Sequence, residues 1–416
     1  MPNPDSLPIV VSGIGIMASN GAGKDQVWQA IQDGRSRMEP VTLFDTSQFT
    51  SKKAAEIADF NPGKILGEKG LRLLDRTTKL GLCAAKYALD DARFPVEEGT
   101  SRRLGVALSS AMGSVESRAG YYLDLYTEGF VGLNPAIFPN TVINSPASQI
   151  AIHFKTTGFN TTISNGFTGT LDALLYGANM IRWNKADAVL AGGVEALNPF
   201  IYAGFEKMGF LSRKTPDSEE MIRPFDRRRN GSVLGEGAVV LVLETLQNAE
   251  RRGAPLYAEI ASGRTLFDRE SYLRYPAGGE SLGKAIRHIF SKESIGPDSI
   301  DFVSASANGT RPADASEAKA LFEVLGSGKA KPLAAASKSL FGETFGASGG
   351  FQVAYALFGL EKNLVPPSLN CEQIDPECGV LCTGTTPREK KIRNVLVSSV
   401  SPMGYSSAVL LRKPPL

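Results

Sequence analysis

The chain has 416 residues, enough for a large core, and its hydrophobic share of 42% and charged share of 21% are ordinary for a globular protein. A net charge of +2 gives no electrostatic argument for a nucleic acid or a membrane as partner. The first residues lack the pattern of a signal peptide, and no apolar run has membrane-span length. Four cysteines do not suggest a disulfide framework, so a cytoplasmic location is expected.

Histidine is scarce, and this limits the chemistry that the chain can support. His153 is expected at the end of a helix or in a short strand, and His288 follows a helical pattern. Neither lies in a glycine-rich loop, so a histidine-based triad or a zinc site is hard to build. Cys371, Cys378 and Cys382 have a spacing that fits no common zinc motif, and a surface loop is expected there. We therefore expect no bound metal.

An apolar segment at 9–17 predicts the first strand and contains Gly13-x-Gly15-x-x-Ala18, which is similar to a dinucleotide-binding loop. The next helix is expected only at 25–31, after an intervening turn. Because the motif needs the helix to start at once, a tight exit from the strand is the better interpretation. No nucleotide cofactor is expected.

The following segment, 71–92, has the apolar spacing of an amphipathic helix, with Arg72, Arg76 and Lys79 expected on its outer face. Helical patterns then alternate with short apolar segments through the rest of the chain. This alternation predicts a layered α/β fold. The predicted strands lie at 103–111, 186–195, 238–244, 257–261, 300–305, 332–336, 395–399 and 408–411.

The most informative stretch joins a β-branched run, 161–163, to a helical pattern at 171–183 through Asn165-Gly166. A strand that turns sharply into a helix holds the residue at its elbow where an active site could use it. Backbone N–H groups at the start of the helix are also free there. A buried strand ending at the pair Gly192-Gly193 follows.

These segments resemble the β-ketoacyl synthases, the condensing enzymes of thiolase fold. The resemblance extends to Arg223-Pro-Phe-Asp226 and to Gly235-Glu-Gly237. It implies two similar halves, 1–255 and 256–416, which form a five-layer α-β-α-β-α sandwich with the site at their junction. It also implies that substrate arrives on the phosphopantetheine arm of an acyl carrier protein. Residue matching shows no internal repeat.

Condensation in this family uses a nucleophilic cysteine, two histidines and two backbone N–H groups. Counting from the glycine pair places Phe167 at the cysteine position. Asn308 and Glu343 stand at the histidine positions, and Lys338 is retained. Pro402, which has no N–H, stands where the last glycine-rich loop would donate to the oxyanion.

These replacements predict a chain without condensing activity of its own. Phe167 cannot attack a carbonyl carbon, and its ring would block the acyl channel. Asn308 can donate a hydrogen bond but does not cycle as an acid. Glu343 would be anionic unless buried and would repel a developing enolate. No catalytic residue is therefore expected, although Glu343 could also be a retuned general acid.

Within the family, the chain resembles the chain length factors, the ketosynthase β subunits of type II polyketide synthases. Many of these have Gln at the cysteine position, where this chain has Phe167. The resemblance implies a heterodimer with an active ketosynthase, as a subunit of an acyltransferase complex that extends a polyketide or polyene chain. Candidate residues for the end wall of the elongation tunnel are Met112, Val115, Glu116, Ala119 and Tyr122, although plain helix packing explains them equally well.

Two alternatives remain open. The chain could be a divergent β-ketoacyl-carrier-protein synthase or a malonyl-carrier decarboxylase that uses Glu343 and Asn308. It could also be a homodimeric scaffold for acidic carrier proteins, bound through Arg72, Arg76 and Lys79, which serve equally well as a solvated helix face.

Overall fold

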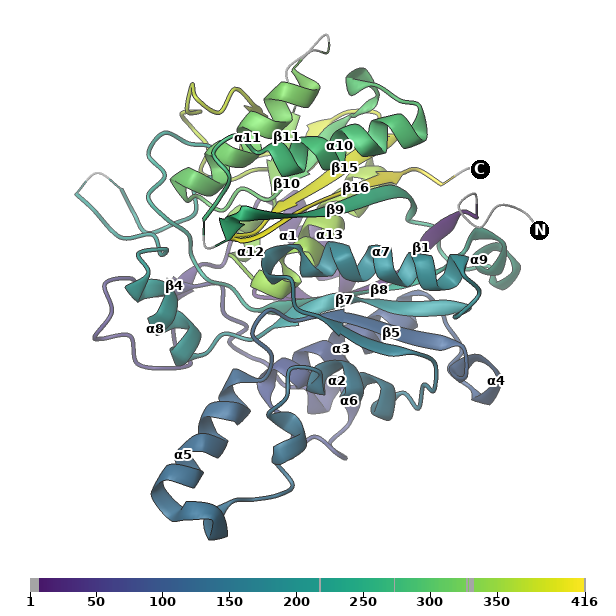
Figure 1. Cartoon of the computed structure of the whole chain (residues 1–416), viewed down its shortest axis with the longest axis vertical. Helices are drawn as coiled ribbons and strands as arrows, with labels where there is room; N and C mark the ends of the chain where they lie inside the picture. Colours follow the sequence, from purple (N-terminus) through teal and green to yellow (C-terminus); the bar gives the residue numbers. More distant parts are fainter. Residues whose placement is uncertain (1–6, 217, 273, 327, 329–332, 415–416) are drawn as a thin grey trace.

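The computed structural model describes residues 7–216, 218–272, 274–326, 328 and 333–414. The main strands are hydrogen-bonded into one continuous sheet, whose two halves lie in separate layers (Figure 1). Its strands lie in the spatial order β13 (Leu381–Cys382), β11 (Leu333–Ala336), β10 (Phe302–Ala305), β15 (Asn394–Val400), β16 (Met403–Arg412), β9 (Ala258–Tyr272), β1 (Ile9–Ala18), β8 (Gly237–Thr245), β7 (Ala188–Glu195), β5 (Leu104–Ser109) and β6 (Asn160–Ile163).

The two sides of this sheet repeat one connectivity. On one side, β1 pairs antiparallel with β8 and β8 with β7, and β5 pairs parallel with both β7 and β6. The other side repeats these pairings: β9 pairs antiparallel with β16 and β16 with β15, and β10 pairs parallel with both β15 and β11. The repeats join where β1 pairs with β9 through Val10–Glu259 and Val11–Ala258. The structure thus contains an internal repeat that residue matching did not reveal.

Helices cover both faces of the two repeats and complete five layers (Figure 1). In the middle, α7 (Gly169–Arg182) packs against α13 (Ser348–Lys362). The outer layers are α3 (Arg76–Asp91) with α6 (Ser145–His153), and α10 (Glu280–Glu293) with α11 (Arg311–Leu325). The predicted thiolase-like sandwich is confirmed, whereas the boundary near residue 255 stays a prediction. Strands covered on both faces need no polar side, which explains the continuous apolar runs in β1 and β8.

Shorter elements complete the described chain. They are α1 (Gly23–Gln32), α2 (Gly63–Leu66), α4 (Glu98–Ser101), α8 (Pro199–Lys207), α9 (Leu246–Arg252), α12 (Lys338–Phe341), β2 (Gly21–Ala22), β3 (Glu39–Pro40), β4 (Lys53–Ala54), β12 (Leu364–Val365), β14 (Arg388–Glu389) and the 3-10 turns η2 (Phe138–Asn140) and η4 (Pro297–Ser299). Within the described residues, no helix has the length and apolar character needed to span a bilayer.

The helix α3 corrects two expectations. It begins at Arg76 rather than at residue 71, because the Asp75 side chain caps it by accepting a hydrogen bond from the Thr78 N–H at 2.9 Å. The Arg76 side chain does not face outward. It lies 2.6 Å from the buried carboxylate of Glu236, which is far away in the sequence.

The glycines of the first strand have a packing role. A Cβ atom at Gly15 would lie 1.9 Å from the Ala84 carbonyl oxygen, and one at Gly13 would lie 2.5 Å from that of Ala88. These positions therefore allow β1 to approach the backbone of α3 closely. This contact accounts for the spacing that resembles a dinucleotide-binding loop.

The helix α5 (Val115–Gly132) projects away from the layered body (Figure 1). None of its residues is buried, and its outer part is interrupted at Gly129, which has a φ of +70°. Tyr126 and Phe130 are 89% and 84% exposed. An extended apolar surface of this kind is typical of a surface that a partner covers.

Candidate functional site

The predicted elbow is confirmed. A single 3-10 turn, η3 (Gly166–Thr168), connects β6 to α7. Gly166 has a φ of +63°, and a Cβ atom there would lie 2.6 Å from the Ser401 hydroxyl oxygen. The turn therefore requires glycine, both for its backbone conformation and for the close approach of the segment after β15. Phe167 follows and is 3% exposed.

Phe167 belongs to an aromatic cluster formed with Phe205, Phe210 and Phe345. Its ring centroid lies 5.6 Å from that of Phe345 and 6.3 Å from that of Phe210. The centroid of the Phe205 ring lies 4.7 Å from that of Phe345 and 5.0 Å from that of Phe210. The space in front of the elbow is thus filled by rings from three separate segments of the chain.

Phe345 occupies the corresponding elbow of the second repeat. It opens η5 (Phe345–Ala347), which leads into α13 as η3 leads into α7. Its φ of +47° is unusual for a bulky residue and holds the ring against Phe167. Phe345 was not predicted as a site residue. The small residues Ser348-Gly-Gly that begin the next helix could have indicated a second elbow here.

Lys338 and Glu343 form a buried ion pair beside the aromatic cluster. The Lys338 ammonium lies 2.8 Å from Glu343 Oε2 and 3.2 Å from Ser306 Oγ. It also lies 5.4 Å from the centroid of the Phe167 ring, within the range of a cation–π contact. Both side chains of the pair are almost fully shielded from solvent.

Both oxygens of Glu343 have partners. Oε2 accepts from the Asn308 side-chain amide at 3.3 Å in addition to Lys338. Oε1 accepts from the Ser348 hydroxyl and from the Phe345 N–H. The structure therefore brings together Phe167, Lys338, Asn308 and Glu343 as the resemblance implied, in a closed hydrogen-bonded arrangement.

Two further buried carboxylates, Asp314 and Glu317 on α11, hold the loop that carries Asn308. Asp314 accepts from the Asn308 N–H at 2.9 Å, and Glu317 accepts from the Ser306 N–H at 2.8 Å. Burial raises the pKa of Asp314 to about 6 and the pKa of Glu317 to about 7. Their contacts with backbone N–H groups give them a structural role in positioning this loop.

The turn between β15 and β16 lies against the elbow, and its backbone N–H groups are already engaged. Ser401 donates to the Tyr405 carbonyl, Met403 to the Ser401 hydroxyl and Gly404 to the Ser401 carbonyl. Pro402 has no N–H. This turn consequently has no free donor for an oxyanion.

A pocket of ≈ 740 Å³, called the mouth pocket below, approaches the aromatic cluster from the surface. Phe205 and Phe210 line it, and the Phe210 ring contacts that of Phe167. Arg228, Arg274 and Arg311 also line it and give it a basic character.

The five wall candidates fall into two groups. Met112 and Val115 are partly buried and pack against the hydrophobic cluster that contains Phe167. Glu116, Ala119 and Tyr122 instead line an open groove of ≈ 710 Å³ between α5 and the start of α8. The wall candidates therefore extend from the aromatic cluster, at Met112, to the groove beside α5, at Tyr122.

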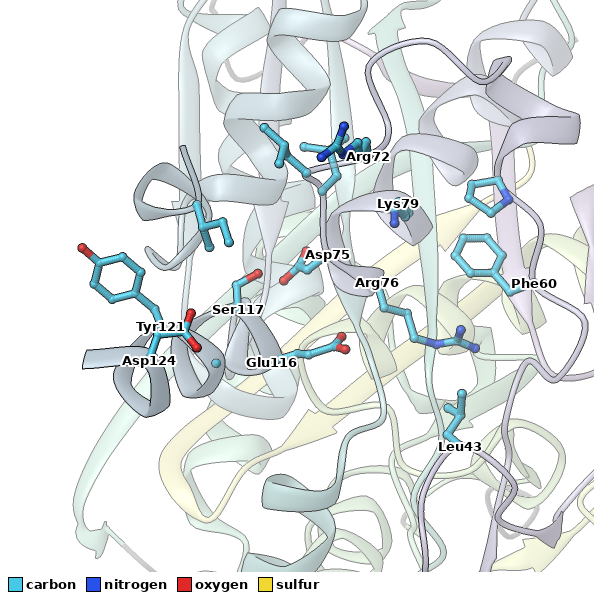
Figure 2. A pocket seen from close by; sticks show the side chains of 15 residues that line it. Leu43, Phe60, Arg72, Asp75, Arg76, Lys79, Glu116, Ser117, Tyr121 and Asp124 are labelled. Carbon is cyan, nitrogen blue, oxygen red and sulfur yellow. The ribbon is translucent and has the colours of Figure 1, made fainter. Parts of the chain in front are cut away.

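A second cavity, of ≈ 500 Å³, lies between α5 and the start of α3 (Figure 2). Figure 2 shows Arg76 and Glu116 reaching into it from these two helices. The basic residues Arg72 and Lys79 line it together with Asp75 and Asp124. Because both signs of charge meet here, the cavity has no basic surface suited to an acidic protein.

Glu195, which sequence analysis missed, connects the wall segment to the second elbow. Its carboxylate accepts from the N–H groups of Ala111, Met112 and Gly346 at 2.8–3.2 Å and from the Ser110 hydroxyl. Burial raises the pKa of Glu195 to about 7. An acidic residue that ends an otherwise apolar strand was the available signal.

Comparison with known proteins identifies the family. Residues 6–249 match the model of the β-ketoacyl synthase N-terminal domain, and residues 257–372 match that of the C-terminal domain. The chain belongs to the β-ketoacyl synthase family.

Both curated relatives and solved structures place this ketosynthase-like chain near type II polyketide synthases. It is 31% identical to the tetracenomycin polyketide synthase ketoacyl synthase alpha subunit of Streptomyces glaucescens, over 98% of this chain and 97% of that protein. It is 30% identical to the 3-oxoacyl-(acyl-carrier-protein) synthase 2 of Coxiella burnetii, over 97% and 98%.

Two solved structures are similar over 98% of this chain and 100% of their own. One is the ishigamide ketosynthase/chain length factor, with a TM-score of 0.91 and 27% identity. The other is a type II PKS acyl-carrier protein in complex with its ketosynthase bound to the hexaketide, with a TM-score of 0.88 and 25% identity. Polyketide ketosynthases are thus among the neighbours of this chain in both sequence and structure.

Proposed function

We propose that this ketosynthase-like chain is a chain length factor: a non-condensing subunit that pairs with an active ketosynthase and helps to shape the cavity in which the polyketide or polyene chain grows. One observation carries the proposal. The elbow that would present a nucleophile holds Phe167, buried among Phe205, Phe210 and Phe345. A hydrocarbon ring can neither attack a thioester nor leave room for an acyl chain at this position.

The polar groups around the elbow support the same conclusion. A general acid or base must be able to exchange its proton with the reacting group. Glu343 is ion-paired with Lys338, and its second oxygen is also engaged. Asn308 has no titratable proton at neutral pH, and Pro402 cannot donate an N–H. This argues against a decarboxylase in which Glu343 and Asn308 are the working pair.

The exposed helix α5 supports a protein partner. Its apolar side chains Tyr126 and Phe130 extend from the body, beside the groove lined by Ala119 and Tyr122. A ketosynthase covering this surface would bury the apolar side chains and close the groove into a cavity. The match to a ketosynthase/chain length factor favours an active ketosynthase over a second copy of this chain.

An acyl carrier protein is the proposed carrier of substrate, and the chain itself then needs no cofactor. The mouth pocket is lined by Arg228, Arg274 and Arg311, which suits the acidic surface of a carrier protein better than the mixed charges around Arg72 and Lys79.

The first test is co-expression with a type II ketosynthase that has a cysteine at the elbow. We expect a stable complex that elongates malonyl-carrier substrate, and neither acyl transfer nor carbon dioxide release from the purified chain alone. Carbon dioxide release by the chain alone, abolished by Glu343→Gln, would establish the decarboxylase instead. A stable homodimer that does not bind the ketosynthase would establish the scaffold.

The second test concerns the tunnel. Met112→Ala and Val115→Ala remove side chains next to the aromatic cluster, and we expect the complex to release longer products. Leu73→Ala is the control, because Leu73 is exposed and does not belong to the hydrophobic cluster that contains Phe167. An unchanged product distribution from intact complexes of both wall variants would contradict the tunnel assignment.

A further inference from the structure

Three of the four cysteines lie in one segment that the proposed function does not use. Cys371 is partly buried, and Cys378 and Cys382 are buried against the core of the second repeat. The expected loop is found at Cys371 and Cys378, whereas Cys382 lies in strand β13, and the side chains of Cys378 and Cys382 are not at the surface. The Cys371 and Cys382 sulfur atoms are 2.9 Å apart, and both residues are free thiols.

Hydrogen bonds fix the chain on both sides of this thiol pair. Cys382 lies in β13, which pairs with Ala334 of β11. The residues that flank Cys371 are anchored on the other side, because Asn370 donates to the Ile222 carbonyl at 2.9 Å and the Glu372 N–H donates to Asp226 at 2.9 Å. The two sulfur atoms are thus held together by elements that are fixed independently.

We propose that Cys371 and Cys382 form a reversible disulfide when the protein meets a peroxide. This inference goes beyond the proposed function and does not depend on it. Partly exposed Cys371 is the thiol that a small oxidant reaches first, and Cys382 is within reach to resolve the product.

The chemistry balances with hydrogen peroxide as the oxidant. The Cys371 thiolate attacks one peroxide oxygen, the O–O bond breaks, and a sulfenic acid and a hydroxide form. The Cys382 sulfur then attacks the Cys371 sulfur and displaces the sulfenic hydroxyl as water. In total, two thiols lose two electrons and two protons, and one peroxide becomes two waters. A dithiol reductant reverses the step.

The remaining cysteines are natural controls. Burial raises the pKa of Cys83 and of Cys378 to about 12, so few of these thiols ionise at neutral pH. The hydrogen bond with Cys371, together with burial, also raises the pKa of Cys382. The resolving attack of Cys382 therefore depends on its 2.9 Å distance from the Cys371 sulfur.

The disulfide would restrain a segment that supports the mouth pocket. Between the two cysteines, Gln373 donates its N–H to Asp226, and Asp375 pairs with Arg229 at 2.6 Å. Arg228 and Arg229 line the mouth pocket, so oxidation would fix the backing of this basic entrance.

The test uses the purified full-length chain, with reductant removed and hydrogen peroxide added, followed by acid quenching and alkylation of free thiols. Cleavage after glutamate separates Cys371, in peptide 362–372, from Cys378 and Cys382, in peptide 378–389. We expect these two peptides to be cross-linked in the wild type and in Cys378→Ser, and the link to disappear after treatment with dithiothreitol.

In Cys382→Ser, Cys371 should instead stop at a sulfenic acid that dimedone traps. The cross-link should also raise the thermal midpoint of the wild type and Cys378→Ser by about 3 °C, and not that of Cys382→Ser. Loss of the cross-link in Cys378→Ser, or free alkylation of Cys371 and Cys382 after peroxide treatment, would overturn the proposal.

Discussion

The buried ion pair gives the sharpest prediction for stability. Substituting Lys338→Met keeps a side chain of similar length but removes the ammonium from Glu343 Oε2, 2.8 Å away. Glu343 is then a buried charge with hydrogen-bond donors but no cation. Breaking a buried pair from one side costs about 3–5 kcal/mol. The donors Asn308, Ser348 and the Phe345 N–H remain, so the lower end of this range is expected.

The companion variants separate the charge effect from packing. In Glu343→Gln, Lys338 keeps Ser306 as a hydrogen-bond acceptor and is still attracted by Glu317. We therefore expect this variant to lose roughly 1–3 kcal/mol of unfolding free energy. Lys338→Met combined with Glu343→Gln removes both charges. Its loss of stability should be at least about 2 kcal/mol smaller than the sum of the two single losses.

Equilibrium unfolding in urea measures these differences. Lys86→Met is the matched control, because Lys86 forms an exposed pair with Asp90 and its loss should cost less than about 1 kcal/mol. If Lys338→Met were no more destabilising than Lys86→Met, the ion pair would not hold the site together as the structure indicates.

Three further predictions concern the aromatic cluster, the buried Glu195 and the exposed helix α5. Phe167→Ala should lower the free energy of unfolding by about 3–5 kcal/mol, since it empties the centre of the aromatic cluster, whereas Phe167→Leu should cost less than about half as much in the same urea titration. The pKa of Glu195 is raised from 4.5 to about 7 in the folded protein. The stability that the folded state gains from this shift is therefore fully present below pH 4.5 and is lost as the pH rises to about 7. Thermal melts of Glu195→Gln should therefore depend less on pH across this window than those of the wild type, and an equal slope would contradict the assignment. Phe130→Ser on α5 should weaken co-purification with the ketosynthase while leaving the urea midpoint unchanged, because this side chain is 84% exposed.

Some elements could be predicted from the pattern of neighbouring residues alone. The β-branched run, the Asn165-Gly166 turn and the following helix predicted the elbow, and counting from the glycine pair placed Phe167 on it. The helix α3 was predicted to begin too early because the cap at Asp75 was overlooked, although its side chain and the Thr78 N–H lie within one turn.

Contacts between distant segments could not be predicted in the same way. Arg76 was expected on the surface because its partner, Glu236, is 160 positions away. The rings around Phe167 come from α8, the segment after it and η5, and no local pattern joins them. Lys338 and Glu343 are close in sequence, but they meet because Gly342 ends the helix with a φ of +76° and turns the chain back.

The position of β1 in the sheet has a consequence for how the protein is made. Ile9–Ala18 is made before the rest of the sheet, yet the strands on both sides of it begin only at Gly237 and Ala258. At about 5–20 residues per second, this apolar strand waits roughly 10–50 s for its neighbours. Until then the two faces and both edges of β1 lack their native neighbours, and neither half of the sandwich can close before β8 and β9 have been made.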